Sequence, residues 1–506
     1  MHIFLTKMNY MNNFFKYNFI YKSLHMNVIN TTIICHLFQL SSLSYIFIMD
    51  LVNFQAIQQF FAEGNTLTYA FRKKQLQLLY ATIQQHEAAI FEALYKDLHK
   101  SKEEAYTTEI GFIYAEISHA LTQLQNWMLP QKVSTPIILQ PSSSTIYRVP
   151  LGVTCIIAPW NYPFQLLMAP LIGAIAGGNC AVVKPSEFTP HTAAIIQTII
   201  TQAFTPNYIA VCVGDGATVV TALLQQNRFN HIFFTGSTTV GKAIAQLAAE
   251  KLTPTTLELG GKSPCIVDET ANIKVAAKRI VWGKFTNAGQ TCVAPDYVLV
   301  HSTKKELLIA EMKNAIQQFY GTNAAIASDY GRIVNNNRFQ ILCSYMQQGK
   351  ILYGGESDAD SLYIAPTLIE LEAANMDISL MQDEIFGPIL PIIEYENDDT
   401  VLSILQKHLH PLSLYLFSSN KKKQNYFIEH ISFGGGCINN TLMHLGNPEL
   451  PFGGLMNSGM GQYHGKYSFE TFTRPKSMLN TATWLDAHIK YPPYTGMLKF
   501  LKWFLK

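Results

Sequence analysis

One cysteine and one glutamate stand in segments whose composition suits acyl chemistry. Cys292 ends the run Asn-Ala-Gly-Gln-Thr-Cys, and Glu258 lies earlier in the run Leu-Glu-Leu-Gly-Gly-Lys. A cysteine attacks a carbonyl carbon as its thiolate, and a water molecule deprotonated by a nearby carboxylate can release the thioester that forms. Either residue alone is typical of a structural position, because cysteine is often a small buried side chain and glutamate a solvated charge. Together they are a minimal nucleophile and general base.

These two segments resemble a known family. Residues 258–262 and 287–292 match both active-site signatures of the aldehyde dehydrogenase superfamily. The flanks resemble its class 3 branch, which oxidises fatty and aromatic aldehydes; they are residues 252–254, 282–285 and 293–297. The resemblance spans about residues 55–495. It implies an NAD-dependent oxidoreductase in which Cys292 is the nucleophile and Glu258 the general base.

Composition fits a large globular enzyme. The 506 residues are long enough for about three domains, and 48% hydrophobic with 14% charged residues supports a large core. A net charge of +2 gives no overall basic field, so nucleic acid is not an expected partner. No cysteine and histidine spacing is typical of zinc, so no metal is predicted. The eight cysteines are scattered, mostly in apolar runs, which indicates free thiols and a cytoplasmic location.

Hydrophobic periodicity predicts how the chain positions these residues. Residues 54–128 have long helical periodicity, and the Ser- and Pro-rich residues 134–149 break it as an extended excursion. From residue 150, short apolar runs alternate with helical stretches, and a second such set begins near residue 263. This alternation predicts an α/β fold with two doubly wound domains. The resemblance makes them a Rossmann-like NAD-binding domain and a catalytic thiol domain, with a small β element that bridges a homodimer.

The predicted boundaries follow from these patterns and from the extent of the resemblance. They are an extension at 1–49, an NAD-binding domain at 50–256 with the bridging excursion 134–149, a catalytic domain at 257–445, a bridging and dimerisation segment at 446–490, and a basic amphipathic tail at 491–506.

A loop after the predicted strand 231–235 is a candidate dinucleotide site. It consists of Gly236, Ser237, Thr238, Thr239, Val240 and Gly241 and opens a helix, so that backbone N–H groups can face a pyrophosphate. Thr238 replaces the middle glycine of the common G-x-G-x-x-G pattern, and spacing alone therefore leaves an ordinary strand-to-helix turn open. The superfamily's own fingerprint has this form, which implies cofactor binding.

Lys184 and Glu187 follow a strand at the sheet edge where nucleotides bind. A carboxylate there can accept from both ribose hydroxyls and repels a 2′-phosphate, which favours NAD, although class 3 relatives often tolerate NADP. A surface ion pair is the alternative.

Two further segments are ordinary turns when considered alone. Residues 159–163 contain Trp160 and Asn161, and residues 384–388 contain Glu384 and Phe386. The resemblance implies that Asn161 is the oxyanion donor and that Trp160 belongs to the cofactor site. It also implies that Glu384 holds the nicotinamide ribose and that Phe386 packs on the ring.

The C-terminal third resembles the wall of a substrate tunnel, with two departures from the family pattern. Asn440 occupies a position that is commonly Asp, and Met456 replaces a glycine in a turn that favours positive φ. His444 either lines the tunnel or is a hydrogen-bonded core residue.

The two ends of the sequence fall outside the enzyme pattern. Residues 1–49 have lysines and no acid, and we consider a signal anchor, an organelle targeting peptide, and an upstream stretch with the working start at Met49. We favour the last. The spacing of lysines and apolar residues in 497–506 predicts a short helix with a cationic stripe and an apolar face. This tail either lies peripherally on a membrane or docks on the enzyme itself.

Two other functions are weighed against an aldehyde dehydrogenase that forms acids. One is a CoA-acylating semialdehyde dehydrogenase, and the other is a catalytically silent structural or binding relative. The presence of Cys292, Glu258 and Asn161 together argues against a silent relative, and Glu258 favours hydrolysis over transfer to CoA.

Overall fold

Helices precede the first strand, as the periodicity of residues 54–128 predicts. The computed structural model describes residues 52–506 apart from 375, 487–490, 495, 505 and 506. The helices are α3 (Phe54–Ala62), α4 (Tyr69–Leu98), α5 (Lys102–Ala105), the π-helix η1 (Tyr106–Ile110) and α6 (Gly111–Met128). The extension 1–49 lies outside the described residues, so its three interpretations stay predictions.

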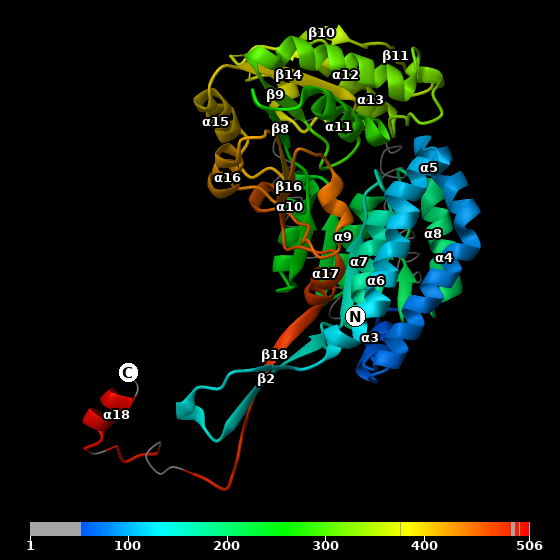
Figure 1. Cartoon of the computed structure of the whole chain (residues 1–506). Helices are drawn as coiled ribbons and strands as arrows, with labels where there is room; N and C mark the ends of the chain where they lie inside the picture. Colours follow the sequence, from blue (N-terminus) through cyan, green and yellow to red (C-terminus); the bar gives the residue numbers. More distant parts are fainter. Residues whose placement is uncertain (1–51, 375, 487–490, 495, 505–506) are drawn as a thin grey trace, which may run out of the picture. The chain divides into compact units, whose positions relative to one another are not determined.

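The first sheet is parallel apart from one short strand, and it carries the predicted dinucleotide loop. Its order is β17-β7-β6-β3-β4-β5, with β17 antiparallel. The strands are β3 (Val153–Ile157), β4 (Cys180–Lys184), β5 (Ile209–Val211), β6 (His231–Thr235), β7 (Thr255–Glu258) and β17 (Gly459–Met460). The linking helices are α7 (Gln165–Gly177), α8 (Pro190–Ala203), α9 (Gly216–Gln226) and α10 (Thr238–Ala249). Figure 1 shows α4, α6, α7 and α8 together beside this sheet. Strands β3, β4 and β6 are buried along their whole length, as expected for a parallel sheet covered on both faces.

A second sheet has the order β10-β13-β14-β9-β8-β15-β16, and only β10 is antiparallel in it. Its strands are β8 (Pro264–Val267), β9 (Tyr297–His301), β10 (Lys350–Tyr353), β13 (Thr367–Leu371), β14 (Ile389–Tyr395), β15 (Ser413–Phe417) and β16 (Gly435–Ile438). The main helices are α11 (Ile273–Phe285), α12 (Lys305–Tyr320), α13 (Asn336–Met346), α15 (Asp398–Lys407) and α16 (Lys421–His430). The two parallel sheets confirm the predicted α/β class, whereas the boundaries at 256 and 445 stay predictions.

The predicted excursion at 134–149 supplies most of the central strand of a separate antiparallel ribbon. Strand β2 (Ser142–Pro150) pairs with β1 (Gln131–Val133) and, over its full length, with β18 (Thr473–Thr481). Figure 1 shows β2 and β18 side by side as a long ribbon. Segments more than 300 positions apart in the sequence therefore form one element.

Met456 has φ 56°, so the turn that the sequence analysis marked as suited to glycine does hold methionine in the left-handed region. Its side chain is exposed, and no neighbouring packing forces that choice of residue.

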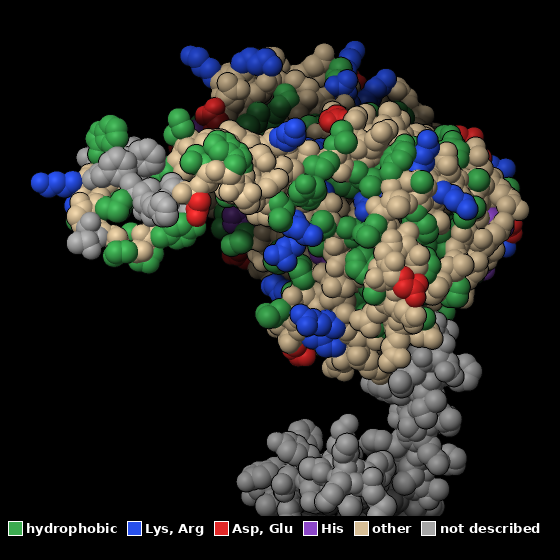
Figure 2. Space-filling model, turned by 90° about the horizontal axis from the view of Figure 1, so that it is seen from below, with side chains coloured by type: hydrophobic (Ala, Val, Ile, Leu, Met, Phe, Trp, Pro, Cys, Tyr) green, Lys and Arg blue, Asp and Glu red, His purple; other side chains and the backbone are tan. Residues whose placement is uncertain are grey.

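The C-terminal tail contains the short helix α18 (Leu498–Phe504), in agreement with the helix predicted within 497–506. Among the described residues, no helix is both long and apolar enough to cross a membrane. Figure 2 views the molecule from below. The lysine and arginine side chains on that face are dispersed among hydrophobic and uncharged ones. The predicted cytoplasmic location stays a prediction.

Candidate functional site

Most of the predicted site residues line one cavity of about 810 Å³. They come from both sheets: Trp160, Asn161, Gly236, Ser237, Thr238, Thr239, Glu258, Cys292, Glu384 and Phe386. Val240 and Gly241 lie one turn into α10, and Lys184 and Glu187 lie outside this lining. The cavity thus joins the candidate nucleophile, the candidate base and the candidate dinucleotide loop.

Cys292 is held by an unusual backbone turn. Asn287, Ala288 and Gly289 are consecutive residues with φ of 53°, 50° and 75°. Gln290 fastens this turn, because its Nε2 donates to Asn287 O at 3.1 Å and to Arg332 O at 2.9 Å, and its Oε1 accepts from Val334 N at 3.0 Å. A Cβ at Gly289 would collide with the carbonyl of Gly387, so glycine is required where the turn meets the segment 384–388.

Asn161 is bound to the cysteine turn through both its side chain and its main chain. Its Nδ2 donates to Gln290 O at 3.0 Å, and its carbonyl accepts from Asn287 Nδ2 at 2.7 Å. The neighbouring Tyr162 hydroxyl lies 2.6 Å from the Thr291 hydroxyl. One N–H of the Asn161 amide is therefore used within the protein, and Asn161 and Cys292 line the same cavity.

Glu258 ends β7 with its side chain buried in the same cavity, and neither carboxyl oxygen has a hydrogen-bond partner. Burial raises the pKa of this carboxyl well above its ordinary value. Its main chain is firmly held, since Glu258 pairs with Gly459 of β17 and its carbonyl accepts from Gly236 N at 3.0 Å. A buried carboxyl with free oxygens is suited to exchange a proton with a water molecule.

Burial is also the main reason that the pKa of the Cys292 thiol is raised, to about 12, and the charges of Glu384 and Glu258 raise it further. Its side chain is half-buried, whereas Thr291 and Val293 on either side are buried. The thiol is thus the part of this segment that faces the cavity, and it is protonated at neutral pH.

Glu384 and Phe386 meet the other two motifs in the cavity wall. Burial, followed by the charge of Asp296, raises the pKa of Glu384 to about 8. Gly260 leaves room for this carboxyl, because a Cβ there would collide with it. The Phe386 ring packs edge-on against Trp160 at 5.3 Å between centroids. Phe386 has φ 45°, a strained conformation of the kind that concentrates at functional sites.

The candidate dinucleotide loop leads directly into the N-terminus of α10. Ser237 caps α10 by accepting from Val240 N at 3.4 Å, and the free N–H groups of the first turn lie beside the cavity. A Cβ at Gly236 would collide with the Phe234 ring, and one at Gly241 would collide with Leu259. The glycines therefore allow the close strand-to-helix packing expected of a dinucleotide-binding turn.

Lys184 and Glu187 form an ion pair with each other, and Glu187 Oε1 also accepts from Gly216 N at 2.8 Å. Burial opposes ionisation, but the contacts with Lys184 and Gly216 outweigh it, and the pKa of Glu187 is below its ordinary value. The carboxylate is held beside the N-terminus of α9. Its predicted contact with a ribose stays a prediction.

Several cavity residues were not singled out as site residues from the sequence. Lys262 pairs with Asp296 and donates to Leu380 O at 2.8 Å, and Arg338 donates to the carbonyls of Glu384 and Ile385. Lys262 belongs to the quoted run Leu-Glu-Leu-Gly-Gly-Lys, so a signal was present. Arg338 lies on α13 outside any motif, and only the fold brings it to the cavity.

His444 is half-buried and hydrogen-bonded, and its placement in a tunnel wall stays a prediction. Its Nε2 lies 3.3 Å from the Ser413 hydroxyl and its Nδ1 lies 3.5 Å from the Cys437 sulfur. Burial lowers the pKa of this imidazole to about 4, so it is neutral at physiological pH.

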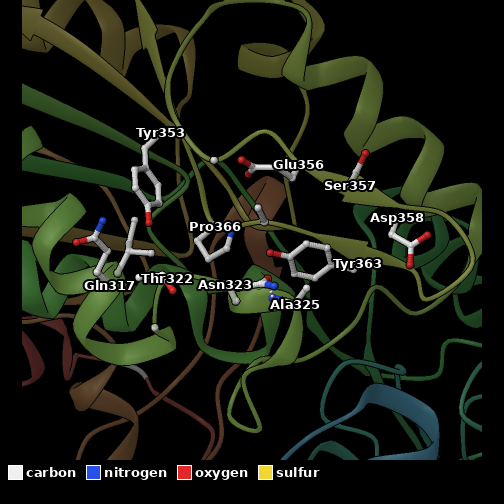
Figure 3. Close-up of a pocket in the computed structure, with 15 residues that line it drawn as sticks. Gln317, Thr322, Asn323, Ala325, Tyr353, Glu356, Ser357, Asp358, Tyr363 and Pro366 are labelled. Atoms are coloured by element: carbon white, nitrogen blue, oxygen red, sulfur yellow. Dashed lines mark hydrogen bonds between the residues drawn. The ribbon is translucent and has the colours of Figure 1, made fainter.

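A separate cavity of about 710 Å³ lies beside α12, as Figure 3 shows. Tyr353, Tyr363, Glu356 and Asp358 contribute to its wall, together with Asn323. None of the predicted site residues lines it, and its lining contains no cysteine or histidine. Its lining therefore offers no thiol nucleophile.

Comparisons with known proteins place the chain in a family. The sequence model of the aldehyde dehydrogenase family matches residues 53–478, and the chain belongs to that family. It is an NAD(P)-dependent oxidoreductase of the aldehyde dehydrogenase type, and its relatives are class 3 members at about 40–51% identity.

Three similar proteins illustrate the relationship. A 4,4′-diaponeurosporen-aldehyde dehydrogenase of Staphylococcus aureus is 51% identical, covering 88% of this chain and 97% of the relative. A dimeric NADP-preferring aldehyde dehydrogenase of Canis lupus familiaris is 42% identical, covering 86% and 95%. The solved structure of Staphylococcus aureus AldH in a substrate-bound state has a TM-score of 0.87 at 49% identity, covering 90% and 98%.

The cavity fits the dinucleotide that this family uses. The first turn of α10 offers N–H donors for a pyrophosphate, and Glu384 offers a buried oxygen without a hydrogen-bond partner. Trp160 and Phe386 add aromatic surface in the same wall.

Proposed function

We propose that this enzyme oxidises medium- or long-chain aliphatic or aromatic aldehydes to carboxylic acids through a thioester on Cys292, with Glu258 as the general base. The observation that carries the proposal is that Cys292, Glu258 and Asn161 line one cavity with the dinucleotide loop. Leu166, Leu259 and Ile341 add apolar surface to its wall, which suits an apolar substrate. The Staphylococcus aureus relative is named for its action on 4,4′-diaponeurosporen-aldehyde.

Bond formation at Cys292 begins the reaction. The thiolate attacks the aldehyde carbon, and the carbonyl oxygen becomes an oxyanion. The second N–H of the Asn161 amide and the backbone N–H of Cys292 are the donors for this oxyanion, and each such donor typically contributes on the order of 3 kcal/mol. The Gln290 carbonyl and the Thr291 hydroxyl hold the two segments in register before substrate arrives.

The thiol proton has to leave a site where burial favours the neutral form. The unpartnered carboxyl of Glu258 lines the same cavity and can accept that proton through water when it is ionised. The tetrahedral carbon loses its hydrogen as hydride while its C=O bond re-forms, which leaves a thioester on Cys292. A bound oxidised nicotinamide would supply the hydride acceptor.

Hydrolysis then regenerates the thiol. Glu258 removes a proton from a water molecule, and the water oxygen bonds to the thioester carbon. The carbon–sulfur bond then breaks to give the carboxylic acid, and the thiolate takes the proton from Glu258. Because burial favours protonated Glu258, the ionised fraction of this base, and with it the rate of hydrolysis, increases as pH rises.

The experiment that tests the function measures NADH formation by purified protein across aldehydes of increasing chain length, with and without CoA. We expect kcat/KM to increase from short to long chains, acid to be the product, and CoA to have no effect. Cys292→Ala is the control and should lose turnover to below about one hundredth of wild type. A requirement for CoA, or turnover by the alanine variant, would contradict the proposal.

Glu258→Gln tests the base. NADH should form once per active site and then stop, because attack and oxidation remain while hydrolysis is lost. Steady-state turnover of the wild type should rise with pH, and the small residual turnover of the variant should lose that dependence. Rapid mixing with NADH absorbance measures both, and the exposed Glu250→Gln is the matched control. Full turnover in Glu258→Gln would show that another group activates the water.

For the cofactor, we propose that NAD is preferred over NADP because the Glu187 carboxylate opposes a 2′-phosphate at the end of β4. Glu187→Gln keeps an oxygen for Gly216 N while removing the negative charge. It should shift the NAD/NADP ratio of kcat/KM toward NADP by about 10-fold, equivalent to about 1.4 kcal/mol. An unchanged ratio would indicate that Glu187 does not face the ribose.

For assembly, we propose a homodimer and a peripheral contact of the tail with anionic membrane. The ribbon of β1, β2 and β18 exposes Tyr147, Met478 and Leu479, and the Canis lupus familiaris relative is named as dimeric. In α18, Lys499 and Lys502 share a short helix with the exposed Leu498. A helix of this length can lie on a bilayer and cannot cross it.

Co-sedimentation with anionic vesicles tests the tail, using protein whose dimeric mass has first been checked by light scattering. We expect weak binding at low salt that is lost at high salt and when residues 497–506 are removed. Neutral vesicles are the control. Binding that survives the truncation, or none at low salt, would leave docking on the enzyme's own surface as the explanation.

A further inference from the structure

A fully buried ion pair lies beside the site and takes no part in the chemistry described above. Lys100 Nζ and Glu109 Oε1 are 2.5 Å apart, and neither side chain is exposed. Lys100 precedes α5, and Glu109 lies in the π-helix η1. Removing two charges from water costs free energy that their attraction offsets only in part, so stability alone is a weak reason to bury them. A short π-helix is also a feature that recurs at functional sites.

Both members of the pair bind the main chain around Asn161. Lys100 Nζ donates to the carbonyl of Asn161 at 2.9 Å and lies 4.0 Å from the centre of the Tyr162 ring. Glu109 Oε2 accepts from Phe164 N at 2.9 Å and from Gln165 N at 3.3 Å, where α7 begins. The pair therefore holds the segment from residue 161 to residue 165 at both of its ends.

The same helical segment also reaches the cysteine turn. Glu104 Oε1 accepts from Asn287 N at 2.7 Å, and Asn287 Nδ2 donates to the Asn161 carbonyl at 2.7 Å. Lys100 and Asn287 thus share one acceptor, the carbonyl of Asn161. Through that carbonyl, the position of Asn161 is linked to the turn that carries Cys292.

We infer that Lys100 and Glu109 are positioning residues for aldehyde oxidation, which fix the Asn161 main chain so that its side-chain amide stays aimed at the reacting oxygen. The inference rests on the proposed function, in which Asn161 stabilises the oxyanion. An oxyanion donor acts only within about 2.7–3.1 Å of the developing charge. A displacement of about 1 Å can reduce the rate about 100-fold, so a rigid anchor on the donor has a measurable effect.

The test replaces the ion pair by the uncharged pair Lys100→Met/Glu109→Gln, because a single change leaves a buried charge without its partner. The matched control is Lys102→Met/Glu103→Gln, which makes the same two substitutions at exposed positions of α5. With enzyme in excess over aldehyde and saturating NAD, the rate constant of NADH appearance per active site reports oxidation before hydrolysis. We expect it to fall about 10- to 100-fold in the buried pair and to be unchanged in the control.

NAD affinity, measured by fluorescence titration, should stay within about twofold in both variants, since the pair touches no residue of the dinucleotide loop. A wild-type rate constant per active site in the buried-pair variant would overturn the inference, even if its melting temperature fell. Should that variant not fold, Lys100→Arg carries the same expectation, because it keeps a positive charge beside Glu109 but places its N–H donors differently toward the Asn161 carbonyl.

Combining the buried-pair variant with Asn161→Ala separates this inference from the proposed function. If the pair acts through Asn161, it should change the rate constant by less than about twofold in the Asn161→Ala background. An equal loss in both backgrounds would overturn the positioning role. If Asn161→Ala alone leaves the rate constant unchanged, the oxyanion role in the proposed function fails instead.

Discussion

The left-handed turn at Asn287, Ala288 and Gly289 is the constraint on which the site depends. A non-glycine residue in this region costs about 1–2 kcal/mol, and two of the three residues are not glycine. The turn persists because buried groups satisfy it: Gln290 binds across it, Glu104 accepts from the Asn287 N–H, and the Asn161 carbonyl accepts from the Asn287 side chain. These hydrogen bonds offset the backbone strain of the turn and fix the position of Cys292, which follows it.

Charge in the cavity is a second, related constraint. Glu258 is buried and Glu384 is half-buried, and both oxygens of Glu258 and one oxygen of Glu384 are buried without hydrogen-bond partners, which is unfavourable for folding. The same desolvation raises the pKa of both carboxyls and of the Cys292 thiol and favours their protonated, uncharged forms. The cavity is therefore rich in groups whose charge is sensitive to what binds there.

Local patterns in the sequence predicted the elements well, and contacts between distant segments less well. The strand at 231–235 and the loop after it were predictable because an apolar run, two glycines and a helical stretch follow one another. The contact of Glu187 with Gly216, the arrival of Arg338 at the cavity and the pairing of β2 with β18 depend on how distant segments pack. The pKa shifts in the site could not be predicted either, because burial causes them and a sequence indicates burial only indirectly. Lys100 and Glu109 lie in no motif that the sequence analysis identified.

The pairing of Glu258 with Gly459 has a consequence for synthesis on the ribosome. Strand β7 is an edge strand of the first sheet until β17 pairs with it. The segment that contains Glu258 therefore has one side without backbone partners while about 200 further residues are synthesised. At the usual elongation rates this interval is about 10–40 s. Throughout it, the exposed edge is open to pairing with other chains. The strand that completes the sheet is only two residues long, and Leu259 N adds one further bond to Ser458 O. Nascent enzyme should thus be most prone to aggregation just before residue 459 emerges, when every catalytic group has already been synthesised.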